Sequence, residues 1–487
     1  MSLLHLPWLE LLVLIPFFGA IWTGRSRDPE RAQRHCVVFM GLTLLCAVGA
    51  WGDFASLDTP EARDGWTAVT ELLGDEALVI DGLSAPLLPL AALLYLATAV
   101  ATMRTKTKRF SFADSLTAEA ILLATLMCRE PWGLVVLLAA GTVPPYLELR
   151  ARRKPTRVYV LHMALFVALL IAGRALFDLG AEASPTVLPP ALLMAAVLVR
   201  SGVFPLHVWM ADLFEHATFG TALLFVTPMV GVYAALRLVL PIAPDWALRS
   251  IALMSLLTAV YAAGMALVQR EARRFYCYLF LSHSSLVLVG LEIATPIGLT
   301  GALSVWLSAG LAVAGFGLTL RSMEARAGRL SLTAYHGFYE HTPMLAAFFL
   351  LTGLASVGFV GTFGFVATEL LVQGTVEAYQ LVGMTVVFAA ALNGIAVVQA
   401  YFRVFTGTRH YASIPLRSRL PERLAVLTLT ALILGYGLVA QPGISSRYRA
   451  ARGLVNSRRG LAPSADLSPS QRPVLPTGAQ GRGSKKG

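Results

Sequence analysis

Apolar stretches of about 20 residues recur along almost the whole chain, and they constrain its fold more than any other feature. The sequence is 56% hydrophobic and only 14% charged, which is too apolar for a soluble domain. A hydrocarbon core roughly 30 Å thick is crossed by helices, because backbone groups must be satisfied within each segment. The sequence therefore predicts an all-α polytopic membrane protein.

We expect about fourteen transmembrane helices before residue 442. The first is expected to be retained rather than cleaved as a signal sequence, because no basic region precedes it and Glu10 interrupts it. The expected spans lie near residues 6–24, 36–52, 82–103, 113–129, 131–148, 157–179, 186–204, 218–241, 246–268, 274–294, 297–320, 343–372, 379–406 and 423–441.

The net charge of +11 is distributed as topology signals rather than as one basic domain, so we expect no nucleic-acid partner. Arg and Lys cluster after the first, third, fifth, ninth, eleventh and thirteenth spans, whereas the loop after the second span is acidic. The positive-inside rule places the basic loops in the cytoplasm. Fourteen spans then put both termini outside, including a basic tail over residues 443–487 whose Pro, Ser and Gly content predicts disorder.

Cofactor chemistry is not expected in this chain. The four cysteines are scattered without C-x-x-C spacing, which argues against an iron–sulfur, haem or zinc site. No glycine-rich nucleotide motif is present either. We therefore predict no cofactor, no metal and no catalytic centre within the chain itself.

The most informative charged residue is Arg200, which ends the seventh apolar span. An ionisable residue inside a membrane is a functional candidate by default, although Arg, unlike Lys, does not release its proton. The stretch that follows is amphipathic, and we expect it either to line a water-filled entrance or to lie as an interfacial helix. Its polar members are His207, Asp212, Glu215 and His216.

Two further segments carry candidate proton carriers. The tenth span buries Ser282, His283 and Ser284, and imidazole among hydroxyls predicts a proton relay, with a helix-packing polar cluster as the alternative. The twelfth span is long and rich in glycine at its middle, which predicts a discontinuous helix. Glu369 follows that break as either a protonatable gate or a solvated carboxylate at the outer interface.

Weaker intramembrane candidates are Glu119, His162, Arg174, Asn393 and Gln399. Each interrupts an apolar span with one polar group. Such a group marks either a polar contact between helices or part of an ion path.

Five segments in order resemble the antiporter-like membrane subunits shared by complex I (NADH–quinone oxidoreductase) and Mrp-type cation/proton antiporters, most closely the M-type chain. One reads like the family's K-S-x-x-x-P-[LF]-H-x-W element, with Arg in place of Lys. The segments are Asp81–Ser84, Arg200–Asp212, Gly231–Arg237, Arg273–His283 and, after His341–Pro343, Gly358–Leu370.

The resemblance implies two inverted five-helix repeats, each with a broken helix, and midplane Lys, His and Glu residues that move protons. The implied divisions are residues 1–112 (first three helices), 113–241 (first repeat), 246–406 (second repeat) and 407–442 (last helix), followed by the tail. It also implies partner membrane subunits, protons or monovalent cations as the transported species, and a bacterial inner membrane.

Several family positions differ in this chain. Arg200 replaces the lysine, Ala139 stands near the expected glutamate, and Thr368 with Glu369 beside it occupies the position of a Lys or Glu. Because a lone midplane Glu or Lys would lack the partner that tunes its pKa, joint loss of the pair is physically consistent.

Three functions remain open from the sequence. The first is a proton-translocating subunit of a complex I-related assembly, and the second is a non-conducting scaffold with the same fold. The third is the membrane subunit of an ion-driven inorganic-carbon uptake complex. The missing Lys and Glu residues favour the second function, whereas the retained His283 and Glu369 favour the first.

Overall fold

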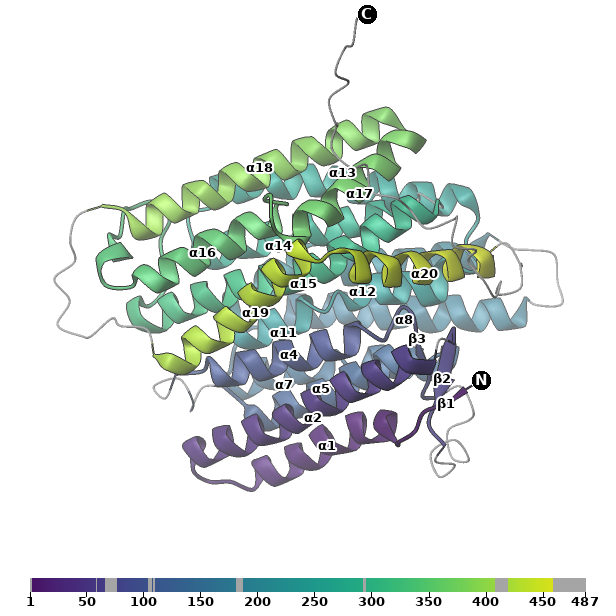
Figure 1. Ribbon diagram of the computed structural model, residues 1–487, viewed down its shortest axis with the longest axis horizontal. Helices are drawn as coiled ribbons and strands as arrows, with labels where there is room; N and C mark the ends of the chain where they lie inside the picture. Colours follow the sequence, from purple (N-terminus) through teal and green to yellow (C-terminus); the bar gives the residue numbers. More distant parts are fainter. Residues whose placement is uncertain are drawn as a thin grey trace, which may run out of the picture.

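The fold is almost entirely helical, as expected, with helices packed side by side along one common direction (Figure 1). This computed structural model describes residues 2–57, 59–65, 77–103, 107, 110–180, 187–291, 295–407 and 419–458. Eight helical segments among these residues are long and apolar enough to cross a membrane. They are α2 (Pro29–Leu57), α6–α7 (Pro131–Ala151), α8 (Arg157–Leu179), α11–η2 (Phe219–Val239), α13 (Asp245–Val268), α15 (Pro296–Ala327), α18 (Gln380–Phe405) and α19 (Leu420–Leu438).

Shorter helices supply the remaining expected spans. Four of them are apolar along their length: α1 (Trp8–Gly24), α4 (Leu87–Val100), α9 (Leu188–Ser201) and α16 (Pro343–Ser356). Further expected spans contain α5 (Phe112–Met127), α14 (Ala272–Val289) and α17 (Phe363–Ala378), whereas α10 (Val208–His216) and α20 (Gln441–Arg458) were not expected as spans. The number fourteen therefore stays a prediction, because several expected spans are divided between two helices.

A three-stranded sheet marks the end of the bundle opposite the basic loops. β1 (Ser2–Leu3) pairs in parallel with β2 (Glu61–Arg63), which pairs antiparallel with β3 (Ile80–Asp81). The sheet lies at the right of Figure 1, near the last turn of α20, and the α1–α2 connection and the start of α19 lie at the left. The N-terminal strand and the C-terminal end of α20 thus share the end of the bundle predicted to be outside.

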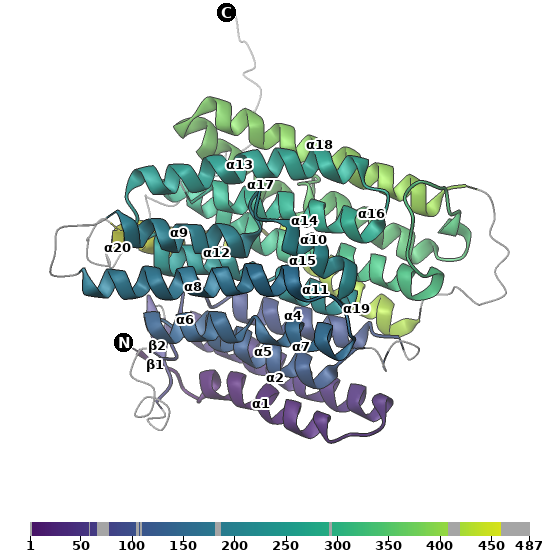
Figure 2. The ribbon, with the colours of Figure 1, turned by 180° about the vertical axis from the view of Figure 1, so that it is seen from behind.

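Helices α14 and α15 form the centre of the molecule. From Phe275 to Val289 every residue of α14 is buried, and α15 packs against α14, α16, α17, α19 and α20. Seen from behind, α8, α9 and α13 cover this centre (Figure 2). Outer helices keep large apolar side chains exposed, for example Leu253 on α13 and Leu381 on α18, as expected for contact with lipid or partner subunits.

The predicted discontinuity in the twelfth span is confirmed. Helix α16 ends at Ser356 and α17 begins at Phe363, and between them Gly358 and Gly361 have φ values of +86° and +87°. Glycine reaches these left-handed angles without steric cost, which explains why the predicted break falls at a glycine cluster. A second break separates α9 from α10 at Gly202, with φ +67°.

The structure corrects one expectation for the C-terminal tail. Residues 443–458, predicted to be disordered, belong to α20, which packs along α15. The buried Arg447 guanidinium of α20 donates hydrogen bonds to the carbonyl oxygens of Gly82 (2.6 Å) and Leu83 (3.3 Å). Composition alone missed this helix because its anchoring partners lie more than 300 residues earlier in the chain. Residues 459–487 lie outside the described residues.

Helices α15 and α17 approach so closely that Gly301 cannot carry a side chain without movement. A Cβ atom there would lie 2.4 Å from the Leu371 backbone nitrogen. We expect Gly301→Ala to lower the free energy of unfolding by about 1–3 kcal/mol, the usual cost of overpacking, measured by SDS titration in mixed micelles. Gly41→Ala on α2, where nothing lies within 4 Å, is the matched control. It should be neutral or stabilising, because alanine favours helix.

Candidate functional site

Arg200 lies buried at the last turn of α9, immediately before the break at Gly202. Its Nη2 donates a hydrogen bond to the Phe225 carbonyl oxygen at 3.2 Å. The guanidinium carbon also lies 4.0 Å from the centre of the Phe225 ring and 5.6 Å from that of Trp209. The cation is thus held by one carbonyl and two aromatic faces, an arrangement that stabilises a fixed positive charge.

The Phe225 carbonyl belongs to the last turn of α11 (Phe219–Val226), where backbone acceptors have no partner within the helix. Past this turn, Met229 adopts φ +50° before α12 (Val230–Ala234) begins. The Pro228 carbonyl at this second interruption accepts a hydrogen bond from Trp306 Nε1 of α15 at 3.2 Å. Arg200 from the first half and Trp306 from the second half therefore meet one broken segment.

A cavity reaches Arg200 from the predicted cytoplasmic side. It follows α5 from Ser111 to Thr125, and Glu148, Thr221 and Arg200 also line it. About 60 Å³ is open to the centres of water-sized molecules, whereas one water needs roughly 10–15 Å³ by this measure. The cavity can therefore hold a few waters next to the buried cation.

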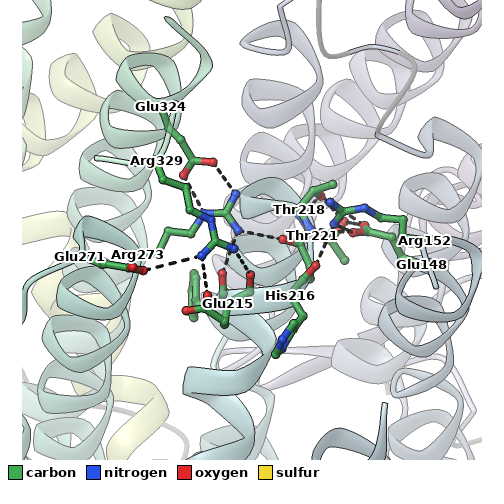
Figure 3. A network of polar contacts seen from close by, with 12 residues as sticks. Glu148, Arg152, Glu215, His216, Thr218, Thr221, Glu271, Arg273, Glu324 and Arg329 are labelled. Atoms are coloured by element: carbon green, nitrogen blue, oxygen red, sulfur yellow. Dashed lines mark hydrogen bonds and ion pairs between the residues drawn. The ribbon is translucent and has the colours of Figure 1, made fainter. Parts of the chain in front are cut away.

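Charged residues bind both sides of the junction between α10 and α11 (Figure 3). Glu148, itself buried, accepts hydrogen bonds from the Thr218 amide (2.7 Å) and from the hydroxyls of Thr218 and Thr221. These donors lie at the N-terminal end of α11, where a carboxylate complements the helix dipole. Arg152 completes the carboxylate's partners at 3.3 Å.

Three arginines cap the C-terminal carbonyls of α10 on the other side of this junction. Arg273 of α14 donates to the carbonyls of Phe214 (2.9 Å) and Ala217 (3.0 Å), and it forms an ion pair with Glu324 of α15. The other two donate to neighbouring carbonyls: Arg152 to His216 and Arg329 to Glu215. Cations at this helix end are stabilising, and Arg273 joins the two halves of the chain.

The predicted entrance residues lie on α10, which is more enclosed than an interfacial helix, since its Trp209, Met210, Leu213 and Phe214 are buried. His216 Nδ1 lies 3.1 Å from an Asp212 carboxylate oxygen. Glu215 instead contacts Arg329, and this hydrogen bond raises the pKa of the Arg329 guanidinium. The predicted entrance residues therefore do not form one connected polar group.

Two of the predicted histidines do not reach Arg200. His207, just after the α9–α10 break, packs its ring against the rings of Phe204, Tyr261 and Tyr278. His162 on α8 lies within 2.8 Å of the Val158 carbonyl oxygen of its own helix. Arg174, on the same helix, forms an ion pair with Asp178. Neither histidine makes a hydrogen bond to the cavity lining among the described residues.

A second polar group lies between α13, α14 and α18. Asn393 Nδ2 donates to Ser282 Oγ at 2.8 Å, and Ser282 donates onward to the Ala259 carbonyl at 2.9 Å. The buried His283 follows Ser282 in the sequence. Within the described part of the chain, its Nε2 has no hydrogen-bond partner. Ser284 does not extend this group, because its hydroxyl donates to the Leu281 carbonyl of its own helix.

Glu369 and Thr368 lie on α17 but do not share one environment. Glu369 is exposed on the outside of the chain, whereas Thr368 is half-buried near Gly358 of the broken segment. Glu369 is therefore not part of the buried polar group around His283. Glu119 is different again: it is fully buried on α5, and neither carboxyl oxygen has a partner among the described residues.

Sequence reasoning missed three residues that the structure brings to the site: Glu148, Arg273 and Trp306. Glu148 is the last residue of the expected span 131–148, where a solvated carboxylate needs no function. The signal that could have found it is Thr218-x-x-Thr221, an N-terminal capping pattern that invites an acidic partner. For Arg273 and Trp306 no local signal exists, because both act on carbonyls of another helix.

Comparisons with known proteins agree with this architecture. The family described as NADH:quinone oxidoreductase/Mrp antiporter, TM, matches residues 159–393. The chain is 28% identical over 281 residues to NADH-quinone oxidoreductase subunit M of Mycobacterium tuberculosis, covering 56% of this chain and half of that relative's length. It is also 27% identical over 442 residues to NAD(P)H-quinone oxidoreductase chain 4 1 of Synechococcus elongatus, with 82% of each chain covered.

Solved structures share the fold at lower identity. A chain of the Mrp complex from Dietzia sp. superposes with a TM-score of 0.81 at 18% identity, covering 92% of this chain and 97% of the other. A chain of respiratory complex I from Thermus thermophilus gives a TM-score of 0.78 at 21% identity, covering 92% and 99%. These likenesses establish the helical architecture and leave the chemistry to the residues of this chain.

Proposed function

We propose that the chain belongs to the antiporter-like membrane subunit family of NADH–quinone oxidoreductases and Mrp antiporters, and that it is a proton-translocating subunit. It would be part of a complex I-related assembly that contains further membrane subunits and lies in a bacterial inner membrane. The proposal assigns no redox centre to this chain. Protons would move in response to conformational or electrostatic changes in the partner subunits.

One observation carries the proposal. In the second repeat (residues 246–406), several buried polar atoms have no protein partner among the described residues. Such atoms are normally satisfied by ordered water. Helices α14 and α15 pack together, and Ser308, one turn beyond Ser304, lies beside the start of α17 after its break. Among the described residues of the second repeat, the unpartnered atoms are Ser255 Oγ, His283 Nε2, Ser285 Oγ, Ser304 Oγ and Asn393 Oδ1.

His283 is the proton carrier in this proposal. A neutral imidazole can accept a proton on one nitrogen and release one from the other, and its unperturbed pKa lies near neutrality. Ser282 and Asn393 would orient water beside it through the hydrogen bond that they share. Arg200 cannot take this role because its guanidinium keeps its proton. It would act as a fixed charge that holds the broken end of α11.

Proton flux into pH-dye-loaded liposomes tests the proposal, using the purified chain with its native partner subunits. We expect His283→Ala to reduce flux by about a hundredfold or more, the usual contribution of a positioned acid–base group. His5→Ala is the matched control, since the His5 side chain is 73% exposed and contacts Asp53. Glu369→Gln should leave flux nearly unchanged, because Glu369 lies outside the buried polar group.

A non-conducting scaffold is the second candidate, and the fixed setting of Arg200 favours it. A guanidinium keeps its proton, and the Phe225 carbonyl and two aromatic faces hold this one in place. Wild-type complex that assembles fully but carries no flux would support the scaffold. Flux that survives His283→Ala would instead show that the proton path lies elsewhere.

A further inference from the structure

Arg200 is a buried permanent cation without a carboxylate partner. Its guanidinium donates to the Phe225 backbone carbonyl, and no acidic side chain of the described residues forms an ion pair with it. Buried charges in proteins are normally paired with an opposite charge, because desolvation is costly. Arg237 pairs in this way with Asp81 and Arg326 with Glu422, whereas Arg447 binds two backbone carbonyls and Arg321 binds a carbonyl and a hydroxyl. Arg200 has a single carbonyl and lines a cavity.

The space for a counter-ion is already present. Arg200 lines the cavity described above, and an arginine has five N–H donors, of which the carbonyl of Phe225 uses one. The Tyr95 hydroxyl of the same lining can donate to an anion, whereas the hydroxyls of Ser115, Thr125 and Thr221 already donate to oxygens of Ser111, Ile121 and Glu148. The open volume of about 60 Å³ suits one small anion with waters, by the measure of roughly 10–15 Å³ for each water.

Two carboxylates also line the cavity, and neither prevents an anion from binding at Arg200. Glu148 is already satisfied by Arg152 and by the donors of Thr218 and Thr221. It lies at the opposite end of α11 from Phe225, roughly 10 Å away along the helix. Asp114 lies in the first turn of α5, where the helix dipole stabilises its negative charge.

We infer that the cavity binds one small monovalent anion, such as chloride or bicarbonate, against the Arg200 guanidinium. The anion supplies at Arg200 the counter-charge that Asp81 gives Arg237 and Glu422 gives Arg326. Because the anion can exchange with the solution, the net charge next to the broken end of α11 depends on whether an anion is bound. This inference holds whether or not the chain conducts protons.

Binding of radiolabelled chloride to the full-length chain in lipid nanodiscs tests the inference. We expect saturable binding of about one chloride per chain, competed by unlabelled bicarbonate, and loss of binding in Arg200→Gln. Arg321→Gln is the control for loss of a buried arginine, because Arg321 contacts Thr98 and Thr102 instead of this cavity. Absence of saturable chloride binding to the wild-type chain would overturn the inference, as would equal binding to Arg200→Gln.

A second pair of variants leaves Arg200 in place. Leu138 lines the cavity, so Leu138→Glu adds a fixed carboxylate there and Leu138→Gln adds a neutral group of similar size. Loss of chloride binding is expected in Leu138→Glu and retention in Leu138→Gln. Retained binding in both variants would place the bound chloride elsewhere and contradict the inference.

Discussion

Replacing Glu422 by alanine should lower the free energy of unfolding by about 3–5 kcal/mol, because it removes the carboxylate from a buried ion pair with Arg326. The two side chains are 3% and 2% exposed, and Arg326 Nη2 lies 2.5 Å from Glu422 Oε2. This pair joins the end of α15 to the first turn of α19. SDS titration in mixed micelles would measure the loss, with helix content as the signal.

The double variant Arg326→Met/Glu422→Leu separates charge from packing. Replacing both members of a buried pair with apolar groups is often neutral or stabilising, since the cost of desolvating two charges disappears. The double variant should therefore recover most of the stability that Glu422→Ala loses. If the double variant is as unstable as the single variant, Glu422 stabilises the fold through its packing and by capping the N-terminus of α19, and not through the ion pair.

Much of the fold could be predicted from the sequence because a bilayer imposes a length and an apolar composition on each span. The break between α16 and α17 was also readable, since Gly358 and Gly361 mark left-handed positions directly in the sequence. The order of motifs indicated the resemblance to antiporter-like subunits. These features are local, and each depends on residues within one segment.

The interior contacts were not readable, because they join segments that are distant in sequence. Trp306 caps a carbonyl 78 residues earlier in the chain, and Arg447 caps carbonyls more than 360 residues earlier. Charge counting predicted basic loops in general. It could not tell which arginines face water and which bind the carbonyl end of a neighbouring helix. Only the packing of helices makes that distinction, as Arg273 illustrates.

Arg273→Gln should be the most disruptive single change at the junction of the two halves, with a loss of about 3–5 kcal/mol in the free energy of unfolding. The change removes the ion pair between Arg273 and Glu324, whose side chains are 13% and 19% exposed, respectively. It also removes both hydrogen bonds from Arg273 to the carbonyls at the end of α10. Because those caps hold α10 against α14, amide hydrogen exchange in α10 should accelerate as stability falls.

Arg329→Gln provides the comparison that isolates this effect. Arg329 also caps α10, through the Glu215 carbonyl, but its side chain is 51% exposed, so solvent screens its ion pairs. A small loss of stability is therefore expected, with little change in exchange beyond the last turn of α10. If Arg273→Gln left exchange in α10 unchanged, the end of that helix would be held by its apolar contacts, and the arginine caps would not be the link between the two halves.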